Sequence, residues 1–561
     1  MPLADRIYRA EVVHTLDPRM PATDAVAVHD GTIIAVGEID CAAVTGPDTE
    51  IVELNGQTMV PGFHDAHAHP VLGGLSMVEC NLDDIHGYRP YLDRIAKYAA
   101  ENPDDDWVLG SGWYGDVFTD GFPHRRDLDS VVRDRPASIT SHDAHGTWVN
   151  TRALEVAGIT RETPDPEGGR IVKDDEGNPT GLLLEAAAEL VTGLFPASTA
   201  ADVERALYNS QDYFHSLGIV GWQDAGVGVL TGSPVDTFHP YISIAEHGGF
   251  ASKVTAALWW DRTVPYARQI ETIKERRAAI QGVDGNRRRG GLQSTVVKIM
   301  LDGVCENLTG ALKRSYRGHD HEHGLLMFEA EELNEIVSGL EANDFDVHIH
   351  AVGDNAVKLA VDALSKNGGP AAERRHQIAH LDIADPAELV RMAEAGIIAN
   401  VQPLWARRDS VLVDTKLPLL HEDQQSHHFT FASMRDAGVR LSFGSDWPVS
   451  SPDPIWGMHV AVNRTAPHND PHGQDDVAQN EPLLPDERIT PAEALRAYTI
   501  DSAYANGYDD VSGSIEVGKS ADFVILDRDP FEVETDDLGD LQVLLTVAAG
   551  EHVYERSRAI V

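Results

Sequence analysis

An apolar run from Thr58 to Val60 leads through Pro-Gly into two histidines, His67 and His69, which are separated by one residue. Alternate residues of an extended strand project from the same face, so both imidazoles point to one side of the chain. Such a pair can chelate a metal ion, although two neighbouring histidines can equally form a hydrogen-bonded polar patch. The choice between these interpretations depends on whether the rest of the chain supplies further ligands.

Seven more apolar, strand-like runs follow this histidine strand and alternate with helical patterns. They lie at residues 218–222, 254–259, 295–300, 346–350, 376–380, 397–401 and 439–443. Alternating strands and helices predict a parallel sheet or barrel, and eight strands is the number in the closed (β/α)8 barrel of the TIM type. We therefore expect an α/β fold with a (β/α)8 TIM-like barrel built from residues 59–71 and 216–507.

The two ends of the chain and one long internal segment lie outside this barrel pattern. Residues 1–58 and 508–561 are both β-rich, and we expect them to pair into one discontinuous β-sandwich. Residues 72–215 are too many for one βα connection, and they contain strand candidates at 107–112 and 137–140. This segment predicts an inserted subdomain over the barrel mouth.

Four of the later strands end in side chains that can bind a metal. Lys298 lies in an apolar run, His350 and His380 end the next two strands, and Asp446 follows the eighth. Taken singly, each has an ordinary explanation, as a lysine that reaches solvent, a packed histidine or an aspartate in a turn. Active sites of this fold lie at the C-terminal strand ends, so their succession favours one shared site with the paired histidines.

The donor types indicate the chemistry of that site. Nitrogen and oxygen ligands suit Zn²⁺ or another first-row divalent ion, and two such ions about 3.5–4 Å apart can share a hydroxide of lowered pKa. Lys298, as a desolvated amine, can take up CO2 to give a carbamate that bridges two ions. Asp446 can bind metal, accept the proton of the attacking water and return it to the leaving group.

The pattern of these residues resembles that of the amidohydrolase superfamily over nearly the whole chain. Two further segments contribute to the resemblance, Val-Pro-Gly-Phe at 60–63 and Gly-Lys-Ser-Ala-Asp-Phe-Val at 518–524. Segments 143–150 and 178–185 are similar to the amidohydrolase 3 group, which includes YtcJ-like proteins and N-substituted formamide deformylases. The resemblance implies a metal set in which Lys298 is carboxylated: His67, His69, Lys298, His350, His380 and Asp446. Cys305 or Glu306, just past Lys298, is the alternative ligand at that place.

Within this architecture we expect hydrolysis of a non-peptide amide-type C–N bond, in an amide, a formamide or a similar group. A metal-activated hydroxide attacks the carbonyl and Asp446 shuttles the proton. One alternative is a mononuclear deaminase, which the absence of a glutamate shortly after His350 disfavours. Another is a metal-binding scaffold without catalysis.

Three residues are candidates for substrate contact, His145, Gln402 and Trp113, although each can equally be a loop or core residue.

The amino-acid composition excludes some classes of binding partner. The chain of 561 residues has 45 basic and 90 acidic side chains, a formal net charge of −45, which repels nucleic acid and anionic membranes. Three scattered cysteines argue against a disulfide framework, and no targeting or membrane-spanning segment is evident, so we expect a cytoplasmic protein. Its expected partner is a small-molecule substrate, and a homodimer is the assembly we expect if the chain associates.

The acidity also predicts a salt requirement of the halophilic kind. Repulsion among 90 carboxylates opposes compaction, and at ~1 M salt the screening length falls to ~3 Å, which removes most of that repulsion. We expect the melting temperature to fall when the protein is moved from molar KCl to dilute buffer. Equal melting temperatures in the two solutions would contradict this expectation.

Overall fold

A barrel of eight parallel strands forms the centre of the computed structural model, which describes residues 2–118, 121–142, 144–166, 168–196, 198–228, 236–283, 286–366 and 374–556. In order around the sheet, the strands are β5 (Phe63–Ala68), β12 (Ile219–Val227), β13 (Lys253–Trp259), β14 (Gly291–Met300), β15 (Asp346–Ala351), β16 (Gln377–His380), β17 (Ile398–Val401) and β18 (Leu441–Phe443). Each of the eight predicted runs overlaps one of these strands, so the predicted barrel sheet is confirmed.

The seam between the first and last strands is closed just past β18. The Asp446 amide donates to the His67 carbonyl at 2.7 Å, and the His69 amide donates to the Trp447 carbonyl at 2.7 Å. Gly444 permits this approach, because a Cβ atom at that position would lie 2.6 Å from the His67 backbone nitrogen. The closure places the residues that follow β18 directly beside the histidines of β5.

Helices cover the outside of the barrel and bury its apolar surface, as expected for βα units. The main ones are α7 (Ala200–Ser216), α8 (Phe238–Glu246), α9 (Tyr266–Val283), α10 (Ala330–Glu341), α11 (Asp354–Leu364), α12 (Pro386–Ala395), α14 (Phe431–Asp436), α17 (Pro491–Tyr498) and α18 (Ile500–Ala505). Thr490 and Glu493 form the capping box that begins α17, with Pro491 in its first turn.

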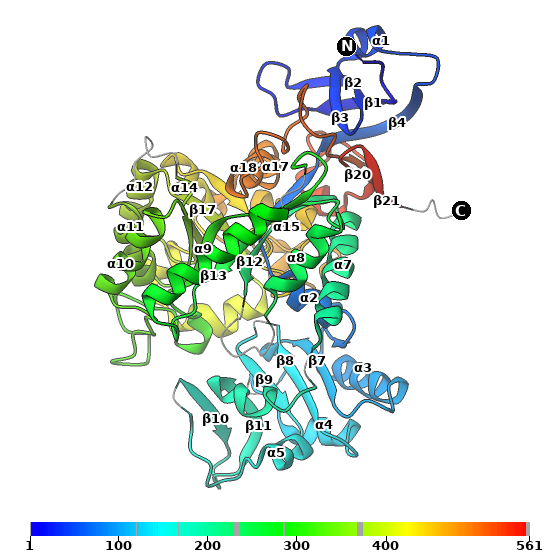
Figure 1. Cartoon of the computed structure of the whole chain (residues 1–561). Helices are drawn as coiled ribbons and strands as arrows, with labels where there is room; N and C mark the ends of the chain where they lie inside the picture. Colours follow the sequence, from blue (N-terminus) through cyan, green and yellow to red (C-terminus); the bar gives the residue numbers. More distant parts are fainter. Residues whose placement is uncertain are drawn as a thin grey trace.

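Strands from both termini form a seven-stranded sheet on one side of the barrel (Figure 1). Its order is β21 (Glu551–Glu555), β20 (Val543–Ala548), β19 (Phe523–Leu526), β4 (Glu50–Pro61), β1 (Arg6–His14), β2 (Ala22–His29) and β3 (Thr32–Val36). The hydrogen bonds define one continuous sheet, where the sequence predicted a two-sheet sandwich, because β4 and β19 pair directly. The sheet curls around its own core, and its edge strand β3 meets the C-terminal segment where Ile33 N donates to Lys519 O at 2.9 Å.

A six-stranded sheet in the segment between β5 and β12 lies at the opposite side of the barrel (Figure 1). Its order is β10 (Gly169–Lys173), β11 (Pro179–Glu185), β9 (Gly146–Val149), β8 (Ala137–Ser141), β7 (Val108–Trp113) and β6 (Cys80–Asn81). The helices α3 (Tyr88–Glu101), α4 (Arg125–Val131) and α5 (Thr151–Ala157) belong to the same segment. The two strands predicted in this segment correspond to β7 and β8.

Within the described residues, no helix is long and apolar enough to cross a membrane.

A buried ion pair connects the barrel to the terminal sheet. Lys253 Nζ, at the start of β13, lies 2.6 Å from Asp522 Oδ1, just before β19, and both side chains are almost fully buried. Burial lowers the pKa of Lys253, while the nearby Asp522 carboxylate opposes that shift. The ammonium also donates to Ser520 Oγ at 2.9 Å. Each charge therefore depends on the other for compensation.

We expect Asp522→Ala to lower the free energy of unfolding by about 3–5 kcal/mol, because it leaves the Lys253 charge buried and unpaired. Urea unfolding followed by circular dichroism measures the change. Glu53→Ala is the matched control, since its pair with Arg9 in the terminal sheet is half exposed and such pairs contribute about 0–1 kcal/mol. Equal effects of the two substitutions would contradict this role of the buried pair.

Candidate functional site

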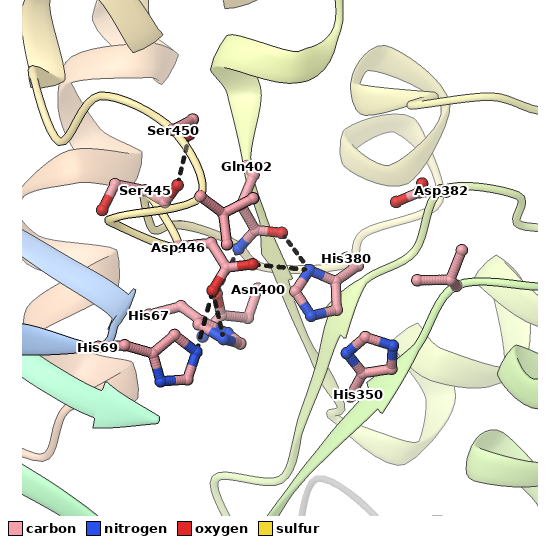
Figure 2. Close-up of polar contacts among 12 residues, drawn as sticks. His67, His69, His350, His380, Asp382, Asn400, Gln402, Ser445, Asp446 and Ser450 are labelled. Atoms are coloured by element: carbon pink, nitrogen blue, oxygen red, sulfur yellow. Dashed lines mark hydrogen bonds and ion pairs between the residues drawn. The ribbon is translucent and has the colours of Figure 1, made fainter. Parts of the chain in front are cut away.

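Asp446 is the centre of a cluster of side chains at the C-terminal ends of the barrel strands (Figure 2). Its Oδ1 atom lies 3.3 Å from His67 Nε2 and 3.1 Å from His69 Nε2. Burial alone would raise the pKa of Asp446, but the contacts with His69, His380 and Lys298 outweigh burial and lower it. The carboxylate is therefore ionised where it meets the histidine pair.

His380 approaches the same carboxylate from β16, with Nδ1 at 3.9 Å from Asp446 Oδ2 (Figure 2). Gln402 Oε1 lies 2.9 Å from the same ring nitrogen and fixes the orientation of the imidazole. Both His380 and Asp446 have positive φ angles, 75° and 59°, which side-chain-bearing residues rarely adopt. Backbone of this kind is typical of functional sites, where surrounding contacts hold it in place.

Lys298 and His350, the remaining two residues of the predicted set, lie next to His67 and His380 respectively. Lys298 Nζ lies 3.2 Å from His67 Nε2, and the His350 and His380 rings are 4.3 Å apart between centroids. Burial lowers the pKa of Lys298 to about 7 and that of His350 to about 3. At neutral pH His350 is therefore neutral, and a large fraction of Lys298 is an uncharged amine, the form that can act as ligand or nucleophile.

The cluster fits a divalent metal ion. Ligand atoms of His67, His380 and Asp446 all lie within 4.8 Å of one another, and all three residues are buried. Asp446 Oδ1 is buried between the Nε2 atoms of His67 and His69, which are metal-ligand atoms of the type that Zn²⁺ takes. Burial lowers the pKa of His67 and of His380 well below the ordinary value, so both imidazoles keep the lone pairs that a metal requires.

A buried polar network supports the ligand side chains from below. His348 Nε2 lies 3.1 Å from His67 Nδ1, so His348 supports the orientation of that ring, and Gln223 lies 3.2 Å from the other nitrogen of His348. Asp65 Oδ1 accepts hydrogen bonds from the backbone amides of His67 and Ser445 at 2.9 and 3.0 Å. The Asp65 carboxylate thus holds β5 and the segment after β18 together.

A cavity of about 580 Å³ lies between the inserted sheet and this cluster. His350, His380 and Asp446 line its barrel side, while Trp113 and His145 line it from the insertion. The predicted insertion thus contributes to the wall of the cavity. The rest of the lining is mixed. Its apolar and aromatic members include Phe118, Leu182, Leu184, Leu404, Trp405 and Phe429, and its charged members include Asp116, Glu306, Asp382, Arg407, Asp409, Asp414 and Lys416.

The three residues predicted to contact substrate have different surroundings. Trp113 donates from Nε1 to the Ile139 carbonyl at 2.8 Å, and His145 Nδ1 lies 3.0 Å from Glu185 Oε2. Both therefore face the cavity from fixed positions. Gln402 is buried against His380 and is not among the residues that line the cavity. The contact with His380 indicates that Gln402 orients that imidazole.

The alternatives to Lys298 have different surroundings, and Glu306 also lines the cavity. Cys305 is buried in an apolar cluster with Tyr316 and Leu420, and burial raises the pKa of its thiol well above the ordinary value. Glu306 Oε1 lies 2.9 Å from Lys416 Nζ. Neither belongs to the metal-type cluster found among the described residues. Asp143 of the 143–150 segment lies outside the described residues.

Two charged features of the site have no marker in the sequence. Lys416 Nζ lies 2.6 Å from Asp382 Oδ2, and both residues are in the cavity wall. Asp302 accepts backbone hydrogen bonds from Ala311, Val352 and Gly353 at 2.8–3.0 Å, while burial raises its pKa to about 7. The signal that could have suggested Asp302 is its position four residues past Lys298, at the end of the same strand.

Comparison with known proteins agrees with this geometry. The model of the family described as "Amidohydrolase family" matches residues 50–554. The putative amidohydrolase YtcJ of Bacillus subtilis is 28% identical, and the match covers 98% of this chain and 99% of that protein. The N-substituted formamide deformylase of Arthrobacter pascens is 29% identical, with 97% of each protein covered.

A solved structure has the same overall fold. The crystal structure of an uncharacterized metal-dependent hydrolase from Pyrococcus horikoshii superimposes with a TM-score of 0.71 at 22% sequence identity. The match covers 94% of this chain and 99% of that chain. The likeness therefore extends over the terminal sheet and the insertion as well as the barrel.

Proposed function

Because this chain belongs to the amidohydrolase family, and is thus a metal-dependent hydrolase that acts on C–N bonds, we propose that it cleaves a non-peptide amide-type bond, in an amide, a formamide or a similar group. The observation that carries the proposal is the contact of one buried carboxylate oxygen, Asp446 Oδ1, with the Nε2 atoms of both His67 and His69. That arrangement suits a cation and leaves the carboxylate next to the place where water would react.

The proposed metal ligands are the residues expected at the C-terminal ends of the barrel strands. His67, His69, His380 and Asp446 would hold one ion, Zn²⁺ or another first-row divalent metal, and Lys298 and His350 would extend the site toward a second. When bound, a divalent ion supplies Lewis acidity, which polarises a carbonyl and lowers the pKa of water. His348 contacts the His67 ring and Gln402 contacts the His380 ring, so these contacts fix the orientation of both imidazoles.

Lys298 is proposed to be carboxylated. Its amine is buried, its pKa is lowered to about 7, and among the described residues no carboxylate lies within ion-pairing distance of it. An uncharged amine attacks CO2 and loses a proton, which gives a carbamate anion. That anion would offer two oxygens to the site beside His67.

Asp446 is proposed as the proton shuttle. Its pKa is lowered, so the carboxylate is ready to accept a proton from the attacking water. It then delivers that proton to the nitrogen that leaves, so that the amine departs neutral. The apolar part of the cavity wall would hold an uncharged acyl or alkyl group.

The deaminase alternative receives less support. It needs a carboxylic acid close after the strand-five histidine, and the residues after His350 are Ala351, Val352 and Gly353. The next acid, Asp354, accepts a hydrogen bond from the Lys313 backbone at 2.9 Å and begins α11. The Asp354 carboxylate therefore links the start of α11 to the loop that contains Lys313.

We expect Asp446→Asn to keep the fold and much of the metal but to reduce kcat by about two or more decades, because the amide cannot carry the proton. Steady-state rates on a panel of formamides, N-acyl amines and lactams, with metal content from plasma mass spectrometry, measure the effect. Asp436→Asn, the same change at an exposed residue of α14, should leave the rate unchanged. Near-normal turnover in Asp446→Asn would refute the shuttle role.

We expect Lys298→Ala to lower both metal content and rate, because it removes the group that would bridge two ions. Added acetate or propionate should restore part of the rate by occupying the place of the carbamate. Asp446→Asn treated with the same acids should gain nothing. Full metal content and full activity in Lys298→Ala would eliminate the carbamate.

A further inference from the structure

The backbone at the end of β16 has an uncommon conformation. His380 and Leu381 follow one another with φ angles of 75° and 53°, in the left-handed region that side-chain-bearing residues rarely adopt. Two such residues in succession persist only where surrounding contacts determine the backbone. The direction of the His380 side chain, and thus its approach to Asp446, depends on those contacts.

Backbone hydrogen bonds from two other segments supply part of this support. The Leu381 amide donates to the carbonyl of Ala351, at the end of β15, at 3.1 Å. The Phe429 amide, just before α14, donates to the Asp382 carbonyl at 2.9 Å. The chain that follows His380 is therefore bonded on to two neighbouring parts of the barrel.

A buried ion pair fixes the side chain of Asp382, two residues past His380. The carboxylate is 2% exposed, and its Oδ2 atom lies 2.6 Å from Lys416 Nζ. Among the side chains that the structure describes, Lys416 is the one partner of this carboxylate, and Asp382 Oδ1 accepts no hydrogen bond. Lys416 Nζ also lies 2.9 Å from Glu306 Oε1, so one ammonium joins the loops that follow β14, β16 and β17.

Lys416 is the last residue of the π-helix η6 (Val411–Lys416), an element that is rare and frequently found at functional sites. The same connection after β17 begins with Gln402, whose Oε1 lies 2.9 Å from His380 Nδ1. Gln402 thus holds the His380 ring, while Lys416 holds the chain just beyond it. Both contacts come from one segment.

We propose that Lys416 is a positioning residue for the metal site: its ion pair with Asp382 holds the left-handed turn at His380 and Leu381, and that turn directs the His380 imidazole at Asp446. The inference rests on the proposed metal set. It does not depend on which bond the enzyme cleaves.

Two other roles for the Lys416–Asp382 pair give different results. A pair that only stabilises the fold changes the melting temperature and leaves the metal affinity of the folded protein unchanged. A pair that acts only through its charge has an effect of the opposite sign, because removal of an ammonium from the cavity wall favours a divalent cation nearby. Weaker metal binding after loss of the ammonium therefore distinguishes positioning from both.

The experiment measures the Kd of the full-length protein for Zn²⁺ by competition with a chromogenic chelator. We expect Lys416→Met to bind Zn²⁺ about 10–100-fold more weakly than the wild type, the usual loss when a residue that orients a metal ligand is removed. Lys416→Arg keeps a positive charge beside Asp382 and should lose less. The visible spectrum of the Co²⁺-loaded protein should also change in Lys416→Met, because His380 no longer keeps its position among the ligands.

A second variant keeps the test valid if Lys416→Met does not fold. Lys416→Met combined with Asp382→Asn removes both charges, so the net charge of the pair is unchanged and no unpaired carboxylate is left at position 382. We expect it to fold and still to bind Zn²⁺ about 10-fold or more weakly. The matched control is Lys253→Met with Asp522→Asn, which removes a buried pair at the start of β13 and should lower the melting temperature without changing the Kd.

A double-mutant cycle tests whether Lys416 acts through His380. In the His380→Ala background, Lys416→Met should have no further effect on the Kd, because the side chain that it positions is absent. Unchanged or tighter Zn²⁺ binding in Lys416→Met, or an equal loss with and without His380, would overturn the proposal. The expected dependence on His380 in a protein that hydrolyses no amide would support the positioning role and count against the proposed reaction alone.

Discussion

The closure of the barrel seam is the constraint on which the site depends. His67 and Asp446 are far apart in the sequence, and they meet because backbone hydrogen bonds join the segment after β18 to the end of β5. Gly444 permits the close approach, and Asp65 ties both sides together through its carboxylate. The metal-type cluster is therefore a property of the closed barrel, and no single strand contains it.

Much of this arrangement could be predicted from the sequence, because buried parallel strands are written as short apolar runs and their C-terminal ends share one face of the barrel. Lys298 lies in such a run, His350 and His380 end theirs and Asp446 follows one, and the structure gathers these residues near the paired histidines of β5. The curled single sheet formed by both termini was harder to foresee, because the direct pairing of β4 with β19 leaves no mark in either segment.

The supporting residues could not be assigned in the same way. Gln402 was a candidate for substrate contact, whereas its observed contact is with His380, at the end of the neighbouring strand β16. The contact of His348 with His67 and the Lys416–Asp382 pair join segments that are distant in sequence. Only the packed structure brings such partners together, and periodicity carries no information about them.

The ion pair between Lys253 and Asp522 has a consequence for biosynthesis. The ribosome makes β13 long before residue 522 is available, so a nascent barrel holds an uncompensated ammonium at the base of that strand. Its counter-charge arrives only with the segment that also supplies β19 to the terminal sheet. Completion of the fold is thus coupled to the last part of the chain to be synthesised, because a chain that stops before residue 522 lacks the counter-charge of Lys253.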